Sequence, residues 1–363
     1  SFVLSYAELA CAVPKAGGAF VYAQRAFGPK VGLLAGTAQW IEFVFAPPAI
    51  AFAIGSYFSN FYADSSPLAL AFASYLIFTS LNMWGVKQSA IFELAITVLA
   101  VGELLIFAGV TAPAFEWSTF SMNPLPNGWL GVLPALPFAI WFYLAIEGVA
   151  NIAEEAKNPQ RDISRGFLYA IGTLVVLALL VFFTSVGVAG WEKIVFDPVT
   201  GEPSDSPLPL ALGILLGTDH PLFHLLITVG LFGLIASFHG ILLVAGRATF
   251  EFGRAGYFPK VLGDVHPKRQ TPVKALLFNL CIGSIALLTG KTGDIITLSV
   301  FGALVLYVVS MLSLLKLRTT EPGLERPYKA PGFPYIPYLA LGLALGSFVA
   351  VFYYNLMIGC IFI

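Results

Sequence analysis

The sequence predicts an all-α, polytopic membrane protein of about ten membrane-spanning helices. Composition is the first indication, because 58% of the 363 residues are apolar and only 11% are charged. So few polar side chains could not cover the surface of a soluble protein of this size. Mean hydropathy is +0.85. The other two indications are the lengths of the apolar runs and the side of the membrane on which the basic residues fall.

Apolar runs long enough to cross a hydrocarbon core of roughly 30 Å follow one another along the chain. A partial run at 1–13 comes first, and a polar link over 14–30 follows it. The complete runs cover 31–58, 67–84, 89–113, 131–151, 166–190, 221–247, 272–290, 293–316 and 335–361. We expect a single transmembrane domain over 1–363, with one longer loop at 190–220 rich in Pro, Gly and Asp.

Lysine and arginine fall on alternate links between these runs. Of the 19 basic residues, only Lys193 and Lys291 belong to the other set of links, so 17 share one side. Cytoplasmic links retain positive charge during insertion. The 14–30 link is therefore expected in the cytoplasm and the 190–220 loop outside, in a multi-pass protein of a bacterial-type inner, or plasma, membrane.

Several classes of function are disfavoured by what the sequence lacks. A net charge of −1 offers no basic face for nucleic acid. We find no HExxH, GxSxG or Walker pattern, and the three cysteines Cys11, Cys281 and Cys360 have no metal or redox spacing. We therefore expect no enzyme, no metal site and no resident cofactor.

Four ionisable residues stand out within the apolar runs, because an ionisable side chain near the middle of the membrane costs at least ~2.5 kcal/mol unless it faces a cavity or a partner. They are Glu42, Glu103, Glu147 and His239. Nothing in the sequence around Glu103 indicates a site, so we interpret it as structural. The other three are candidates for substrate binding.

Glu147 has the most informative surroundings, the segment PALPFAIWFYLAIEGVA. Pro134, Pro137 and Gly148 make a regular helix difficult to sustain there. A break would free backbone groups, and transporters use interrupted helices to bind substrates. A carboxylate beside such a break suits an ammonium group. The alternative is that Glu147 caps nearby amides and never contacts a substrate.

Glu42 and His239 support weaker predictions. Glu42 precedes Pro47 and Pro48, which should kink the helix just after the charge and open a pocket. It could equally form an interhelical hydrogen bond that fixes packing. His239 follows Ser237, and both could recognise a hydroxyl group, whereas His239 could also relay a proton or be a packing residue.

Four motifs together resemble the amino acid, polyamine and organocation permeases over essentially the whole chain. In order they are SYAELACAVPKAGGAFVYAQRAFG, IEGVANIAEEAKNPQRDISRG, GRAGYFPKVLGDVHPKRQTPVKA and ERPYKAPGFPYIP. Within that superfamily, WIEFVFAPPAIAFAIGSY and IASFHGILL look most like ethanolamine permeases.

The resemblance implies a five-plus-five inverted-repeat fold whose first and sixth helices are broken and hold the substrate. The chain would begin in the second helix and lack the first and the last. By position, the resemblance assigns the sixth-helix half of the site to Trp141, Ala145, Ile146, Glu147 and Gly148. It assigns the remaining walls to Glu42 and Phe45, to Ser237 and His239, and to Phe301.

The resemblance also implies a secondary transporter for a small cationic or zwitterionic molecule, with ethanolamine as the expected substrate. Some members carry a lysine where this chain has Ala100, so coupling to H⁺ or Na⁺ stays open, as does the oligomeric state. Two alternatives remain. One is an amino acid permease of the same superfamily, and the other is a membrane receptor or sensor that binds a small ligand without flux.

Overall fold

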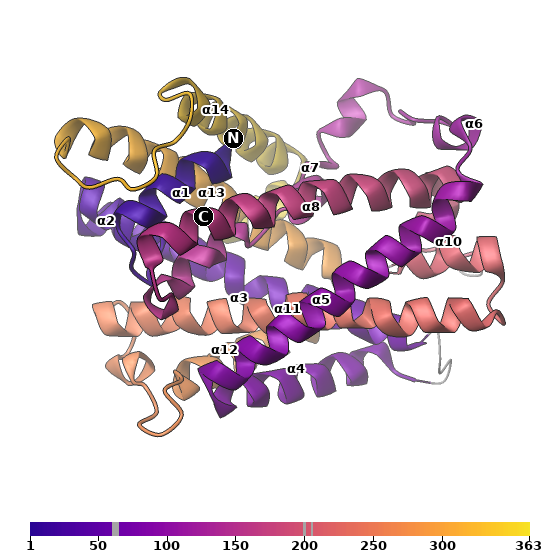
Figure 1. The fold of residues 1–363 in the computed structure, drawn as a ribbon, viewed down its shortest axis with the longest axis horizontal. Coiled ribbons are helices and arrows are strands. Elements are labelled where there is room, and N and C mark those ends of the chain that lie inside the picture. The colour runs from indigo at the N-terminus through magenta and orange to yellow at the C-terminus, as the bar shows by residue number, and fades with distance from the viewer. Residues whose placement is uncertain (60–64, 199–200, 205) are drawn as a thin grey trace.

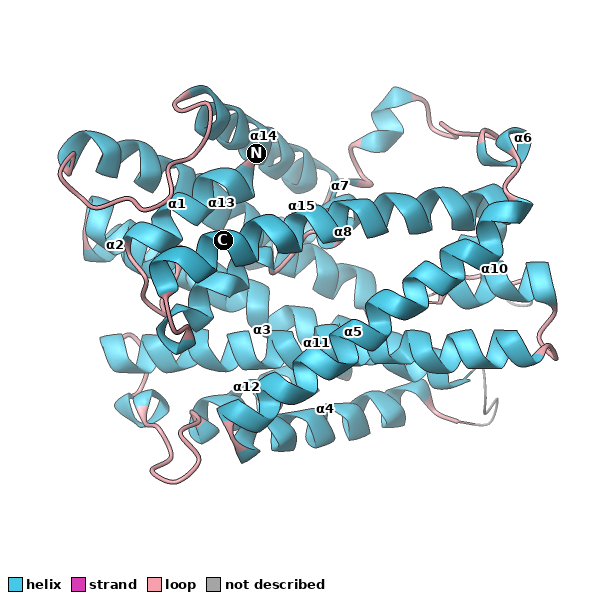
Figure 2. Ribbon diagram, in the orientation of Figure 1, coloured by secondary structure: helices cyan, strands magenta, loops and turns pink. Residues whose placement is uncertain are grey.

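The computed structural model describes residues 1–59, 65–198, 201–204 and 206–363. These residues fold almost entirely into helices (Figure 2), and the described part of the chain has no strand beyond an isolated bridge between Phe196 and Pro203. The all-α prediction is therefore confirmed.

Seven of the described helices are long and apolar enough to cross a membrane. They are α3 (Pro29–Ser59), α4 (Pro67–Trp84), α5 (Val86–Thr111), α8 (Pro159–Ala189), α11 (Pro221–Ala255), α13 (Thr292–Thr320) and α14 (Tyr335–Tyr354). Each corresponds to one of the predicted runs. Helix α3 continues through Pro47 and Pro48 without ending.

Shorter helices account for the remaining predicted runs and for the links. The apolar ones are α1 (Phe2–Ala12), α7 (Leu136–Trp141) with the 3-10 helix η3 (Ile146–Glu155), α10 (Pro207–Leu216), α12 (Val273–Leu287) and α15 (Leu356–Phe362). The links contain α2 (Ala19–Phe27), α6 (Trp117–Phe120), α9 (Trp191–Val195), η1 (Ala112–Ala114), η2 (Trp129–Val132) and η4 (Lys260–Gly263).

Two predicted runs are interrupted helices. The run at 131–151 divides into η2, α7 and η3, in the region where the prolines predict a break. The run at 335–361 divides at Asn355, which separates α14 from α15. The Asn355 side chain donates to the carbonyl of Val351 at 3.0 Å, and this contact competes with continuation of the helix.

The long helices run across the molecule, and their links gather at its two ends (Figure 1). Helix α2 and the link after α11 lie at one end, whereas α6 and α10 lie at the other. The basic 14–30 link and the 190–220 loop are therefore at opposite ends, as the charge pattern predicts.

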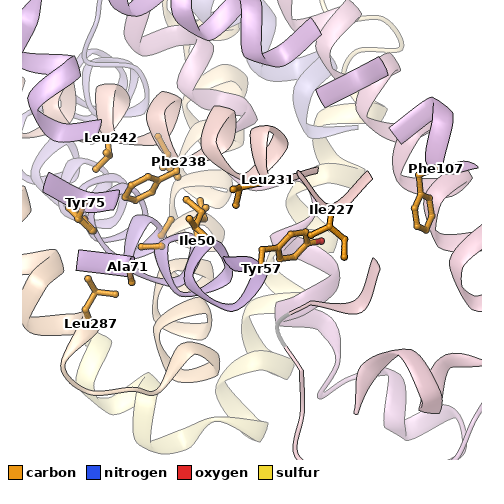
Figure 3. Packing of buried hydrophobic residues seen from close by; sticks show 14 of the residues in the cluster. Ile50, Tyr57, Ala71, Tyr75, Phe107, Ile227, Leu231, Phe238, Leu242 and Leu287 are labelled. Carbon is orange, nitrogen blue, oxygen red and sulfur yellow. The ribbon is translucent and has the colours of Figure 1, made fainter. Parts of the chain in front are cut away.

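Helix α3 is central to the fold and packs against α13, α11, α2 and α4. Its apolar side chains join those of α4 and α11 in the largest buried cluster, which includes Ile50 and Phe238 (Figure 3). Helix α13 approaches α3 closely at Gly302, where a Cβ atom would lie 2.8 Å from the Glu42 nitrogen. Ser299 also donates to the Glu42 carbonyl at 2.7 Å. This close packing fixes the position of Glu42.

A buried ion cluster joins α1 to the end of α13 and the link beyond it. The Glu8 carboxylate is inaccessible to solvent and accepts two hydrogen bonds from Arg318, at 2.6 and 2.7 Å. Arg326 lies 3.2 Å from the same carboxylate, and the Ala330 amide donates to it at 2.7 Å. We refer to Glu8, Arg318 and Arg326 as the arginine cluster.

Candidate functional site

The chain changes direction between α7 and η3 at Ala145. This residue has φ +66°, in the left-handed region that a side chain with a Cβ rarely adopts. Holding it there costs on the order of 1–3 kcal/mol. The preceding helix closes with Leu144 donating to Trp141, and η3 opens with Gly148 donating to Ala145 at 3.0 Å. The predicted break in this segment is present.

The break brings two carboxyl groups together. Glu147 lies in the first turn of η3 and Glu42 lies in the middle of α3, and their side chains face each other within hydrogen-bonding distance. Their exposed fractions are 1% and 0%. We refer to these two residues as the carboxyl pair.

The carboxyl pair has few other polar partners. The Tyr307 hydroxyl donates to Oε2 of Glu147 at 3.2 Å. Within the described residues, the other three carboxyl oxygens have no hydrogen-bond donor inside the usual distance, although the Ala145 backbone lies against both groups. No lysine, arginine or histidine of the described chain forms an ion pair with either residue.

This arrangement favours binding of a positive charge. Two carboxylates in contact, shielded from water, repel each other and lose their hydration. A cation placed between them would compensate both losses and would satisfy the unpaired oxygens. The site can therefore hold an ammonium group or a proton, whereas a second anion would be repelled.

Two cavities lie beside the break, with volumes of about 770 Å³ and 670 Å³. Ala145 and Ser237 line both cavities, Ile146 lines the larger, and Trp141 and Gly148 line the smaller. The carboxyl pair lines neither of them. Five of the predicted site residues therefore line a cavity and the two glutamates do not.

His239 is fully buried and is joined to the cavities through a glutamate. Its Nδ1 lies 2.8 Å from Oε2 of Glu93, and Glu93 lines both cavities. Asn82 donates to the His239 backbone carbonyl at 3.2 Å. The histidine ring therefore reaches the cavities through Glu93 rather than directly.

The two predicted aromatic walls lie elsewhere. Phe301 is fully buried and packs against Phe348 and Phe362, at ring distances of 5.7 and 5.5 Å. Phe45 packs with Ala286 beside Trp141. Neither aromatic ring lines the cavities described above, because each side chain points toward a neighbouring helix.

Sequence reasoning missed two residues of this region. Glu93 lies four residues inside the predicted run 89–113, and its position near the end of that run concealed it. Tyr307 follows Phe301 by six residues, and a tyrosine in an aromatic-rich helix gives no signal. Glu103, which we expected to be structural, lines the larger cavity.

Polar contacts join η3 to its neighbours on the side of the carboxyl pair nearer α2. One turn from the pair, Gln39 of α3 donates to Asn151 of η3 at 3.3 Å, and both are buried. Farther along, the Ala16 amide donates to Glu154, and Arg254 lies 3.7 Å from the same carboxylate. These contacts separate the pair from the end of the molecule that carries α2.

The described residues contain no group of three or more His, Cys, Asp or Glu side chains arranged to hold a metal ion. The polar groups at the break are therefore considered as binding groups for an organic molecule or a proton.

Comparison with known proteins gives concordant matches. The amino acid permease family matches residues 1–359. An uncharacterised transporter of Rhizobium meliloti is 28% identical, over 95% of this chain and 75% of its own length. A branched-chain amino acid permease of Bacillus subtilis is 26% identical, over 93% and 75%. A low-affinity putrescine importer of Escherichia coli is 28% identical, over 86% and 69%.

Proposed function

The chain belongs to the amino acid permease family, and we propose that it is a secondary transporter that carries a small organic cation across the membrane by alternating access. We propose ethanolamine as the substrate. The carboxyl pair Glu42–Glu147 is the observation on which this proposal rests.

A primary ammonium group fits the carboxyl pair chemically. It carries one positive charge and three N–H donors, and the pair offers three oxygens without a close donor. Charge-assisted hydrogen bonds of this type contribute about 1.5–3 kcal/mol each. The left-handed turn at Ala145 presents both carboxyls to the same small volume, so one ammonium group can contact both.

Access to the pair requires movement of the helices. Both carboxyls are buried, and the contacts Gln39–Asn151 and Glu154–Arg254 lie on the side of the pair nearer α2. Ala145, Ile146 and Gly148 line the cavities and are the chain neighbours of Glu147. A shift of η3 relative to α3 would therefore open the pair to a cavity, and this movement is the gating step that we propose.

Recognition of the ethanolamine hydroxyl is assigned to the polar groups on α11. Ser237 lines both cavities, and His239 acts there through Glu93. The serine hydroxyl can both donate and accept a hydrogen bond. We propose that Ser237 contacts the substrate hydroxyl and that the His239–Glu93 pair positions it.

An amino acid is the second candidate substrate, and the names of related proteins favour it. They include a branched-chain amino acid permease and a serine/threonine exchanger, both of Bacillus subtilis. An amino acid also needs donors for its carboxylate, which broken helices usually supply from free amides. Here the Ala145 backbone faces two glutamates. Because two glutamates already face this part of the backbone, the site is better suited to a substrate amine that has no carboxylate.

Competition experiments in proteoliposomes separate these candidates. We expect unlabelled ethanolamine to inhibit uptake of labelled ethanolamine and alanine or arginine to leave it unchanged. Inhibition by the amino acids at similar concentrations would instead support an amino acid permease. Saturable binding with no flux into the liposomes would instead indicate a receptor or sensor.

The variant Glu147→Gln tests the role of the carboxyl pair. We expect its affinity for ethanolamine to fall on the order of tenfold or more, because one charged contact is lost. The matched control is Glu325→Gln, an exposed glutamate in the link after α13, which should transport normally. If Glu147→Gln retained the original affinity, the assigned role of Glu147 would be ruled out.

A further inference from the structure

No cationic side chain of the described residues pairs with the carboxyl pair, which raises the question of what offsets its charge when no substrate is bound. A carboxylate is only an acceptor of hydrogen bonds, whereas a protonated carboxyl group has one O–H donor. The side chains of Glu42 and Glu147 lie within hydrogen-bonding distance of each other. That contact is attractive only when one of the two groups carries a proton.

No described side chain around the pair supplies a positive charge. The titratable side chains that face the pair are Tyr6 of α1 and Tyr307 of α13, with Tyr22 of α2 behind Tyr6. Helix α11 presents Val244 at Gly148, and α7 contains no titratable residue. Tyrosine hydroxyls can donate hydrogen bonds but supply no positive charge.

We infer that Glu42 and Glu147 share one exchangeable proton, and that an ammonium-bearing substrate displaces this proton when it binds. The inference rests on the proposed function and extends it, because it makes transport an exchange of the organic cation for a proton. The O–H bond of the shared proton breaks, the proton passes to water on the side from which the substrate enters, and the ammonium nitrogen keeps all its hydrogens.

Charge balance gives this exchange a distinctive property. Before binding, two carboxyls and one proton carry a net charge of −1. After binding, two carboxylates and one ammonium carry the same net charge. The binding region therefore keeps the same charge in both states, and the exchange moves no net charge across the membrane. Neither half of the cycle therefore has to bury more charge in the bilayer than the other half.

Protonation also explains how two acidic residues can occupy one buried position. Interacting carboxyls lose their protons in two separate steps that belong to the pair rather than to either residue. The first step leaves one shared proton, and the second is unfavourable until a cation arrives. Binding of the cation therefore releases the proton.

Proton release on binding is the direct test. Titration calorimetry of the purified full chain with ethanolamine, in two buffers with different ionisation enthalpies, measures the protons released per cation bound. We expect about one proton per ethanolamine in the wild type. Infrared difference spectra should show loss of a protonated carboxyl band when ethanolamine is added.

The variant Glu42→Gln supplies the contrast. Its amide can donate to Glu147 in place of the shared proton, so binding should release no proton. Uptake by Glu42→Gln should then respond to an imposed membrane potential, whereas wild-type uptake should respond to a pH gradient alone. The control Glu325→Gln should match the wild type in both measurements.

The outcomes separate this inference from the proposed function. Binding of ethanolamine by the wild type without proton release would overturn the shared proton and leave the proposed function standing. Binding that required Na⁺ and released no proton would overturn it in favour of sodium coupling. Failure of the wild type to bind ethanolamine or any other small amine would overturn the proposed function and this inference together. The wild-type measurement needs no variant, so a folding defect in Glu42→Gln cannot obscure it.

Discussion

The arginine cluster and the carboxyl pair both contain buried glutamates, but the two regions differ in the partners that surround the buried charge. Glu8 has no exposed surface and is surrounded by Arg318, Arg326 and the Ala330 amide. Glu42 and Glu147 are equally buried, and their closest described polar partners are each other and the Tyr307 hydroxyl. Burial is the same in both regions, whereas the number of positive charges differs.

This difference separates a structural role from a functional one. A buried carboxylate with two guanidinium partners is satisfied in a single arrangement and fixes α1 against the end of α13. A buried carboxyl pair without a cation is unsatisfied until one arrives, so its state depends on what binds. Burial of an acidic group in a membrane protein therefore does not identify a site by itself. A binding site is indicated when the buried acidic group has no positively charged partner among the described residues.

The largest expected effect is in the arginine cluster. Glu8→Gln leaves two guanidinium groups without their carboxylate, and breaking a buried pair typically costs 3–5 kcal/mol. We expect a loss of about 3 kcal/mol in unfolding free energy, because Arg318 keeps 22% exposure and can regain water. Thermal unfolding in detergent measures it, with Glu325→Gln as the control. An unchanged melting temperature would show that the cluster does not hold α1 in place.

The second prediction concerns the stability of the carboxyl pair. Glu42→Gln replaces the shared proton with an amide that can donate to Glu147 and removes one buried acid, so we expect stability to be unchanged or to rise by about 1 kcal/mol. The same thermal unfolding experiment applies. A destabilisation as large as that of Glu8→Gln would erase the contrast between the two regions and would assign the pair a structural role.

A smaller effect is expected from Tyr307→Phe, which removes the one hydroxyl that donates to Glu147. A hydrogen bond to a charged acceptor contributes about 1.5 kcal/mol at the lower limit, which corresponds to roughly a tenfold change in an equilibrium constant. At 3.2 Å the contact is long, so we expect ethanolamine affinity to change less than tenfold. Binding measured by calorimetry would test this, and a loss as large as that of Glu147→Gln would make Tyr307 a principal binding residue.

The smallest effect is expected at an exposed ion pair in the link next to the arginine cluster. Arg25 donates to Glu321 at 2.6 Å, and this hydrogen bond holds the pKa of the Glu321 carboxyl below its ordinary value. A lowered pKa in the folded state means that the pair stabilises the protein above the ordinary glutamate pKa. The contribution disappears as the pH falls through the lowered pKa.

Both side chains of this pair are about one third exposed, so solvent screens the interaction and it contributes about 0.2–1 kcal/mol at neutral pH. Thermal unfolding of wild type and Glu321→Gln across a pH series from 7 downward should show a difference that is present at pH 7 and shrinks as the carboxyl is protonated. The difference should also shrink in high salt. A difference that did not change as the pH fell would exclude the ionised carboxylate as its origin.

The membrane class, the approximate positions of the spans and the break near Glu147 could be predicted from the sequence. Each depends on local properties, namely apolar run length, the charge of short links and the proline content of one segment. The boundaries at 67–84 agree with α4. The division of 335–361 at Asn355 was missed, because a single asparagine in an apolar run predicts no end of a helix.

The candidate site could be predicted only in part. Glu42 and Glu147 were each identified as a charge in an apolar run, and the family resemblance assigned both to one site, but their direct contact could not be predicted from the residues alone. The wall roles of Phe45 and Phe301 depend on which face of a helix each side chain occupies, and neither ring lines the two cavities described. Glu93 of α5 contacts His239 of α11, and the two residues are 146 positions apart in the sequence.

The sequence by itself determined that this chain is a helical membrane protein and that acidic groups lie within its spans, because hydropathy and charge act residue by residue. Only the tertiary structure decided which acids are compensated. Whether a buried acid is compensated depends on which side chains of distant helices lie within a few ångströms of it. Arg318 lies beside Glu8, whereas Glu42 and Glu147 lie beside each other. That proximity, rather than the presence of a glutamate, separates a fixed ion cluster from a pair that can exchange its cation.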